Sequence, residues 1–371
     1  MDINRVIIII MVFFMALGAL DRIFGNRYGL GTEFEEGFNA MGPLAVSMLG
    51  GITLAPVLAK ILSPIIVPIY GFFGADPSVF ATTFLACDMG GYSLAMELAN
   101  TNEAGVFSGI ILGTTMGPLI TFNIPVALSI VEKKDHKAVA TGMLAGIITI
   151  PLGALVGGLL GGFGMISTIR NLIPSALFAL IVALGLWKIQ DIMIKIFNVF
   201  GKIVIAVLTA GLAASVAEEL TGIVIIPGMA SLSEGFQIIG SIGIVLAGAF
   251  PMIYVITKLL NKPLTKIGEK FGMNDVAAAG FLSTLANNIP TFKNLKDMNY
   301  RGKVMNVAFS VSAGFTFGDH LGFTAGVQPE MIMPMIVGKL VGGITAVMLV
   351  PLILPKGTAE DELDSSSELE D

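Results

Sequence analysis

The chain has 371 residues, of which 54% are hydrophobic and only 13% are charged, and its mean hydropathy is +0.86. This composition excludes a soluble domain and a nucleic-acid-binding protein, and it indicates a chain whose main solvent is lipid. The single cysteine, Cys87, excludes an intramolecular disulfide and a multi-cysteine metal site. The formal net charge is −6, but seven of the acids lie in the last fifteen residues.

Eleven apolar segments follow one another along the chain, and a helix needs about 20 such residues to cross a hydrocarbon core about 30 Å thick. They are Ile3–Leu20, Phe38–Tyr70, Val79–Leu98, Val106–Val131, Ala138–Phe163, Leu172–Trp187, Val199–Ala217, Phe236–Leu259, Val276–Phe292, Val304–Phe317 and Met331–Leu354. We therefore predict an all-α polytopic membrane protein. A cleaved signal peptide is the alternative for the first segment, but no A-x-A site follows it and the second half contains its counterpart.

The two halves of the chain repeat each other. EEGFNAMG at Glu35–Gly42 matches SEGFQIIG at Ser233–Gly240, an offset of 198 residues. The same offset pairs Phe73–Gly90 with Phe271–Asn288. Self-similarity of this kind indicates an internal structural repeat.

This repeat divides the chain into four parts. We predict a first five-segment repeat, a linking transmembrane helix, a second repeat and a disordered acidic cytoplasmic tail, at residues 1–165, 166–198, 199–355 and 356–371.

Basic residues are distributed unequally between the repeats. None lies between Lys60 and Lys133. The matching part of the second half contains Lys258, Lys262, Lys266, Lys270, Lys293, Lys296, Arg301 and Lys303. Cytoplasmic loops collect lysine and arginine, so equivalent loops should lie on opposite faces of the membrane. The two repeats are therefore predicted to be inverted copies.

The third segment of each repeat has the same charge character at both ends. The loops flanking Val79–Leu98 have no basic residue, whereas those flanking Val276–Phe292 are basic. We therefore predict two re-entrant hairpins beside about nine full spans, with turns at Asp88–Gly91 and Asn287–Pro290. A broken helix that crosses the membrane is the alternative for each segment.

Inverted repeats with discontinuous segments are the recurring architecture of secondary transporters, and their binding sites lie near the midplane between the breaks. Asp88 stands in the first break beside Gly90 and Gly91, which allow the chain to turn. An acid inside the membrane is costly, so it is a candidate for substrate binding. A protonated or paired structural acid is the alternative.

Other polar residues fall near the breaks. Asn287 and Asn288 are expected either to bind a hydroxyl or amine or to cap the second hairpin. Asp319 and His320 are expected to form either a proton relay or a polar pair that meets water. Adjacent helical residues point about 100° apart, so we predict no metal site there.

Thr115 and Asn123 are weaker candidates, because threonine in a membrane helix usually bonds to its own backbone. Lys60 and Lys339 are the only basic residues within the apolar segments near this site, and we expect both to snorkel to the interface. The site should then prefer a small cation or a polar amine. No Walker A, G-x-S-x-G or HExxH motif is present, so neither an enzyme nor a cofactor is predicted.

Three long blocks resemble the EutH family of bacterial ethanolamine-utilisation permeases. They are MDINRVIIIIMVFFMALGALDRIFGNRYGLGTEFEEGFNAMGPLA at the start, ACDMGGYSLA, and STLANNIPTFKNLKDMNYRGKVMNVAFSVSAGFTFGDHLGFTA. The likeness extends to about Pro355 and leaves out the acidic tail. The resemblance implies a multi-pass protein of the bacterial cytoplasmic membrane that imports ethanolamine for a cobalamin-dependent ammonia-lyase pathway.

On this resemblance, we expect the substrate ammonium to pair with Asp88, with Asp319 as a second acid. The Tyr92 ring would make a cation–π contact with the same ammonium. Asn287 or Asn288 would take the hydroxyl. A coupled carrier of another amine or amino acid, a channel, and, least supported, a membrane enzyme are the alternatives. The sequence fits uniport, proton symport and sodium symport equally, and a homo-oligomer is compatible with it.

Overall fold

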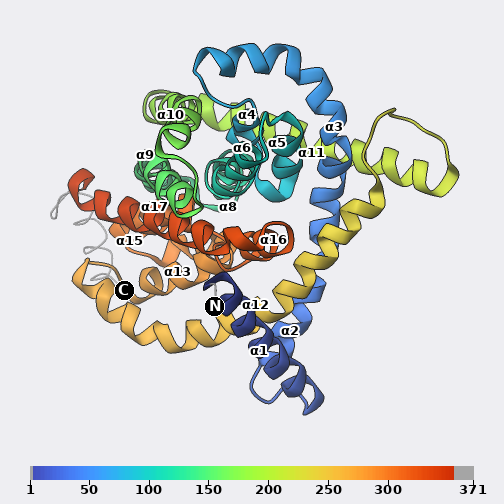
Figure 1. Ribbon diagram of the computed structural model, residues 1–371. Helices are drawn as coiled ribbons and strands as arrows, with labels where there is room; N and C mark the ends of the chain where they lie inside the picture. The colour runs from blue at the N-terminus through green and yellow to red at the C-terminus, as the bar shows by residue number, and fades with distance from the viewer. Residues whose placement is uncertain (1–2, 355–371) are drawn as a thin grey trace.

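The structure is a computed structural model that describes residues 3–354, and the described chain is helical with no β-strand. The predicted acidic tail, 356–371, lies outside the described residues. Figure 1 shows helices α4 to α10 and α13 to α17 gathered in one body, with α1, α2 and α3 along one side of it. Helix α11 runs from α10 towards that side, and α12 returns from there to α13. The chain is thus all-α, as predicted, and has the apolar helices of a polytopic membrane protein.

The first part of the chain contains α1 (Ile3–Ile23), α2 (Leu30–Asn39), α3 (Met41–Phe72), α4 (Ser78–Phe84), η1 (Cys87–Met89), α5 (Gly91–Leu98), α6 (Asn102–Val106), η2 (Phe107–Leu112), α7 (Met116–Pro118), η3 (Leu119–Asn123), α8 (Ile124–Ile130), η4 (Lys133–Asp135) and α9 (His136–Leu160). The turns η1 and η4 are 3₁₀ helical, whereas η2 and η3 are π-helical. The helix α10 (Met165–Lys188) leads to the second part.

The second part contains α11 (Gln190–Thr221), α12 (Leu232–Lys270), α13 (Asp275–Ala286), α14 (Asn288–Lys293), η5 (Leu295–Asp297), α15 (Tyr300–Ala313), α16 (Asp319–Val327), η6 (Pro329–Met331) and α17 (Ile332–Ile353). The helices therefore recur in a similar order after α10.

By length and composition, seven helices of the described chain can cross a membrane. The number is eight if α6–η2 and α7–α8, which meet at an angle of 47°, form one span. About nine spans were predicted. The difference is the segment Val304–Phe317, which falls in α15 and the turn after it; α15 has 14 residues, fewer than the about 20 that a span needs.

Proline bends two long helices, α3 and α12. Helix α3 contains Pro56, Pro64 and Pro68, and α12 contains Pro251 and Pro263. A proline inside a helix removes a backbone hydrogen bond and clashes with the preceding turn. Both helices change direction along their length (Figure 1).

The first helix of each part packs on the other part. Helix α1 lies against α12, and α11 lies against α3. Two glycines allow the approach: a Cβ on Gly248 would lie 2.4 Å from the Met11 carbonyl oxygen, and one on Gly50 would lie 1.8 Å from the Leu208 carbonyl oxygen. Gly50 and Gly248 are related by the 198-residue offset of the repeat.

Helices α9 and α17 pack closely in the centre, and α15 covers both. A Cβ on Gly153 would lie 2.6 Å from the Gly338 carbonyl oxygen, and one on Gly338 would lie 3.0 Å from the Gly157 Cα. Small residues allow helix backbones to approach in this way where lipid offers no hydrophobic driving force.

Each discontinuous segment returns to the place where it begins. The Asn100 amide donates to Asp76 Oδ2 at 3.1 Å, joining the two ends of α4–η1–α5. The Asn274 side chain donates to the Asp297 carbonyl at 2.9 Å, joining the two ends of α13–α14–η5. Helices α4 and α5 have 7 and 8 residues, about 10–12 Å each, so each covers less than half of a bilayer core.

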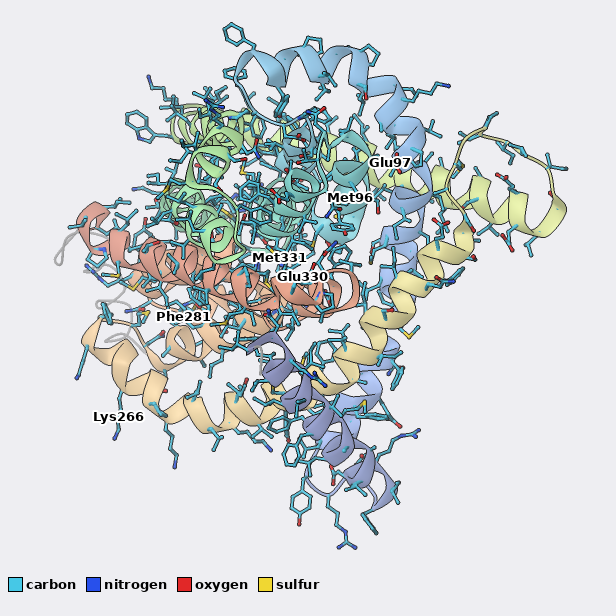
Figure 2. All side chains as sticks on the ribbon, in the orientation of Figure 1. Met96, Glu97, Lys266, Phe281, Glu330 and Met331 are labelled. Carbon is cyan, nitrogen blue, oxygen red and sulfur yellow. The ribbon has the colours of Figure 1, made fainter. Side chains whose placement is uncertain are left out.

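The basic residues of the second part fall into two groups. Lys262, Lys266 and Lys270 of α12 are exposed, and Figure 2 shows Lys266 pointing outward at the edge of the molecule. Arg301 and Lys303 were predicted to belong to a basic loop. They lie in the first turn of α15 and are only 4% and 6% exposed. These two side chains are buried because α9, α13 and α17 pack around α15.

Candidate functional site

The helix breaks meet one another in the centre of the molecule. The Cys87 amide donates to the Gly113 carbonyl at 2.8 Å, so the first hairpin pairs with the break after η2. In the second part, the Phe315 amide donates to the Thr284 carbonyl at 3.0 Å and the Phe317 amide to the Leu285 carbonyl at 2.9 Å. Backbone that leaves the helix at membrane depth needs such partners.

The backbone at two of these breaks is left-handed. Gly90 has φ +83, and its Cα lies so close to α3 that a Cβ on it would sit 2.6 Å from the Gly51 Cα. Only glycine fits there without strain. Phe315 has φ +61 although it is not glycine, and a bulky residue in this region is a rare, strained conformation of the kind found at functional sites.

A cavity of about 60 Å³ lies between the breaks. Its lining residues are Ala86, Asp88, Met89, Pro118, Phe122, Phe315, Asp319 and His320. The structure thus brings together Asp88 from the first hairpin and Asp319 from the first turn of α16, both half-buried. A cavity needs about 10–15 Å³ to hold one water-sized group, so this cavity is large enough to admit one.

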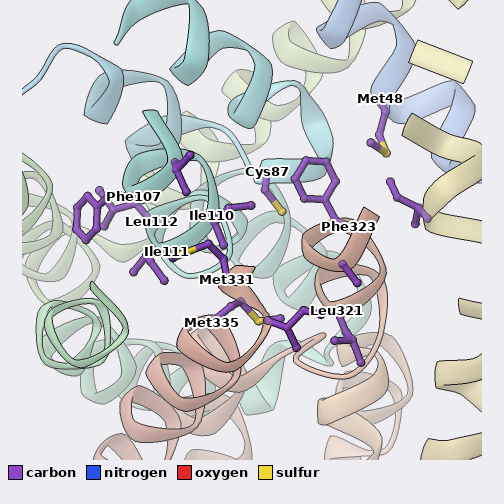
Figure 3. Packing of buried hydrophobic residues seen from close by; sticks show 14 of the residues in the cluster. Met48, Cys87, Phe107, Ile110, Ile111, Leu112, Leu321, Phe323, Met331 and Met335 are labelled. Atoms are coloured by element: carbon purple, nitrogen blue, oxygen red, sulfur yellow. The ribbon is translucent and has the colours of Figure 1, made fainter. Parts of the chain in front are cut away.

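The side chain of His320 is 2% exposed. Its ring lies 5.4 Å from that of Phe315, and its Nδ1 is a buried atom with no hydrogen-bond partner within the described chain. Cys87 lies behind the cavity, in one apolar cluster with Leu321 and Phe323 of α16 (Figure 3). The first hairpin and α16 therefore share both a polar and an apolar contact surface.

The predicted amides form a separate buried group. Asn288 Nδ2 donates to Asn123 Oδ1 at 2.7 Å, and both side chains also donate to the Ser310 carbonyl. Asn288 Oδ1 is buried with no partner among the described residues. Asn287 accepts from the Ile289 amide at 2.8 Å and so caps α14. The amides therefore lie beside the cavity and do not belong to its lining.

Three further predicted residues have local roles. The Gln328 side chain donates to the Tyr92 hydroxyl at 2.9 Å, and the Tyr92 ring packs edge-on against Phe323 at 5.5 Å. Thr115, in the break after η2, donates through its Oγ1 to the Ile111 carbonyl of η2 at 2.7 Å. Gly91 follows the turn at Gly90, and a Cβ on Gly91 would lie 2.5 Å from the Ala86 carbonyl oxygen.

Lys339 does not snorkel, contrary to the prediction. It is 1% exposed and donates a hydrogen bond to the Thr114 carbonyl in the break after η2. Its ammonium interacts electrostatically with Cys87 and Asp88. The signal in the sequence was a lysine well inside an apolar run, eight residues into α17. Lys60 is exposed, so its snorkelling stays a prediction.

Cys87, Asp88 and His320 place one ligand atom each within 4.8 Å of one another, so they resemble three ligands of a metal site. Thiolate, carboxylate and imidazole are a plausible set for a borderline-soft divalent ion. The buried amine of Lys339 interacts with all three residues, and a positive charge there opposes a divalent ion more strongly than a monovalent one. The arrangement therefore suits a negatively charged pocket with its own cation better than a metal centre.

Comparison with known proteins agrees with the resemblance in the sequence. Residues 3–353 match the family described as "Ethanolamine utilisation protein, EutH". "Probable ethanolamine permease EutH" of Listeria monocytogenes serotype 1/2a (strain 10403S) is 61% identical, with 94% of this chain and 93% of that protein covered. The protein with the same name from Escherichia coli (strain K12) is 45% identical, with 100% and 99% covered. "Uncharacterized protein YxeR" of Bacillus subtilis (strain 168) is 50% identical, with 98% of each covered. No solved structure is significantly similar to this chain.

Proposed function

The chain belongs to the EutH family of ethanolamine utilisation proteins, and on this premise we propose that it carries ethanolamine into the cell. Three similar proteins are named probable ethanolamine permeases. The chain is a multi-pass protein of the bacterial cytoplasmic membrane. The observation that carries the proposal is the cavity that joins Asp88 to Asp319 between the helix breaks.

The substrate in this proposal is the protonated amine. Neutral ethanolamine can cross lipid unaided, whereas a charged ammonium in hydrocarbon is costly, so a carrier is most useful for the charged form. The ammonium pairs with Asp88, and Asp319 is the second acid. Ethanolamine has only four non-hydrogen atoms, and the cavity, of about 60 Å³, is also small.

For the hydroxyl, Asn287 and Asn288 stay the proposed partners. Asn288 bonds to Asn123 in the structure, and its Oδ1 has no partner among the described residues. A substrate hydroxyl that donates to this oxygen would satisfy a buried acceptor. The amides lie beside the cavity, so the second hairpin has to shift for the contact to form.

Transport by alternating access between two inverted halves accounts for the architecture. Two observations support this mechanism. Gly50 and Gly248 are related by the 198-residue offset, and each contacts the other half of the chain. The loops that flank the first hairpin have no basic residue, whereas those that flank the second are basic. Among the hydrogen bonds that link the halves, the one between Tyr92 and Gln328 lies towards the predicted outer face, and the one between Asp135 and Lys303 lies towards the predicted inner face. Breaking one at a time would open the cavity to one side.

Uptake of labelled ethanolamine into proteoliposomes at acidic pH tests the proposal. Asp88→Asn should reduce uptake by at least about tenfold, because a hydrogen bond to a charged group contributes about 1.5–3 kcal/mol. Glu97→Gln is the matched control, since Glu97 lies on the same hairpin and is exposed. Near-normal uptake by Asp88→Asn would remove Asp88 from the site.

The same assay identifies the type of transport. Imposing proton, sodium and voltage gradients one at a time shows which gradient, if any, drives uptake. A carrier saturates with substrate and shows counterflow. Flux that rises without saturation and without counterflow would show a channel.

A further inference from the structure

Lys339 is a buried charged group that the proposed transport mechanism does not use. It lies in α17 next to Gly338, whose close contact with Gly157 holds α17 against α9. The lysine side chain extends to the Thr114 carbonyl, in the break that pairs with the first hairpin through Gly113 and Cys87. The ammonium therefore stands behind the cavity on the side of Asp88.

The titratable groups around this ammonium come from two elements. Cys87 and Asp88 belong to η1, and Asp319 and His320 begin α16. Lys339 interacts electrostatically with Cys87, Asp88 and His320, and Asp88 interacts with Asp319. A buried ammonium is unfavourable unless an opposite charge compensates it. One of the two carboxylates can compensate Lys339.

We propose that Lys339 is a resident cation that sets the charge of the site, so that Asp88 and Asp319 together accept one monovalent ammonium and reject dications such as diamines. This inference rests on the proposed function and specifies its substrate class. With both carboxylates ionised and Lys339 protonated, the site carries a single negative charge. One substrate ammonium neutralises that charge, whereas a diammonium leaves an uncompensated positive charge inside the protein.

A purely structural role for Lys339 predicts something different. If the lysine serves only to bond the Thr114 carbonyl, its replacement changes stability and leaves the preference between monoamines and diamines unchanged. The two roles are separated by a ratio of affinities, because a general loss of stability affects both ligands alike. Ethanolamine and ethylenediamine make a suitable pair of ligands, because they have the same size and ethylenediamine has a second amine in place of the hydroxyl.

The test uses the purified full-length protein at mildly acidic pH, where both amines of ethylenediamine are protonated. Thermal stabilisation by each ligand gives binding, and competition of ethylenediamine against labelled ethanolamine uptake gives transport. The wild-type protein should bind ethanolamine at least about tenfold more tightly than ethylenediamine. Lys339→Gln should shift the ratio by at least about tenfold in favour of the diamine, because the site then carries two negative charges.

Two further variants keep the test decisive. Lys339→Arg keeps the charge and should keep the monoamine preference. The double change Asp319→Asn with Lys339→Gln restores a single negative charge and should restore that preference. If Lys339→Gln alone does not fold, loss of the monoamine preference in this double variant contradicts the inference. An unchanged ratio in Lys339→Gln would overturn the inference, as would a double variant that does not return to the wild-type ratio, or equal binding of the two ligands by the wild type.

Binding and uptake also separate this inference from the proposed function. A wild type that is stabilised by ethanolamine over ethylenediamine but shows no uptake would contradict transport and support the charge rule. Uptake of ethanolamine that ethylenediamine inhibits equally well would support transport and contradict the charge rule. Stabilisation by neither amine would contradict the charge rule as well.

Discussion

Lys303 donates a hydrogen bond to Asp135 at 2.9 Å, and the two side chains are only 8% and 7% exposed. The aspartate ends the turn before α9 and the lysine lies in the first turn of α15, so the pair joins the two parts of the chain. A buried ion pair of this kind adds little net stability by itself, but removing one partner leaves a buried charge uncompensated. This asymmetry makes the pair testable.

Replacing Asp135 by Asn should lower the free energy of unfolding by about 3–5 kcal/mol, because Lys303 then keeps a buried charge without a counter-charge. Replacing both residues by apolar ones of similar size should cost much less. Thermal or denaturant unfolding of the purified protein in detergent measures both effects.

Glu132 provides the control. It lies three residues before Asp135 and pairs with Lys134 at 3.1 Å, but the two side chains are 51% and 67% exposed. An exposed pair contributes at most about 1 kcal/mol, so Glu132→Gln should change the stability little. Equal effects of Asp135→Asn and Glu132→Gln would mean that the buried pair is not formed in the membrane protein.

Gly90→Ala should disrupt the site through the backbone alone. The residue has φ +83, which costs a side-chain-bearing residue about 1–2 kcal/mol, and its Cβ would meet the Gly51 Cα at 2.6 Å. The turn that carries Asp88 must then move away from α3, and ethanolamine uptake should fall by at least about tenfold. Gly42→Ala, which has open space around its Cβ, should transport normally. Normal uptake by Gly90→Ala would show that the turn tolerates displacement.

The amide pair separates substrate recognition from stability. Asn288→Ala and Asn123→Ala remove the same 2.7 Å hydrogen bond from opposite sides, and each should cost about 1–3 kcal/mol because a buried polar group loses its partner. If Asn288 binds the substrate hydroxyl, only Asn288→Ala should also lower the preference for ethanolamine over ethylamine, which lacks the hydroxyl. Uptake competition with ethylamine measures this preference, and an identical preference in both variants would leave Asn288 with a structural role only.

Local sequence signals were sufficient to predict where the two discontinuous segments break. An acid and two glycines in an apolar run predicted a turn at Asp88–Gly91, and the structure has η1 and the left-handed Gly90 there. Asn287, in the second predicted turn, separates α13 from α14. Such features depend on the conformational freedom of single residues, so they are visible in the sequence itself.

Features that depend on distant partners were not predictable in the same way. Asp135 and Lys303 are 168 residues apart, and Lys339 and Thr114 are 225 residues apart. Hydropathy alone places a charged residue in a loop or at the interface, because it does not include the neighbour that compensates the charge. For the same reason, the sequence predicted hydrogen-bonding amides near the breaks without predicting that Asn123 and Asn288 bond to each other.

The last prediction concerns the inverted arrangement of the two hairpins. Gly71 and Asn100 flank the first hairpin, whereas Asp275 and Lys296 flank the second, and all four are exposed. Single cysteines at the first two positions should react with a membrane-impermeant maleimide in intact cells, and those at the other two only after permeabilisation. The native Cys87 is 1% exposed and should give a low background. Labelling of Gly71→Cys and Asn100→Cys from opposite sides would mean that this segment crosses the membrane.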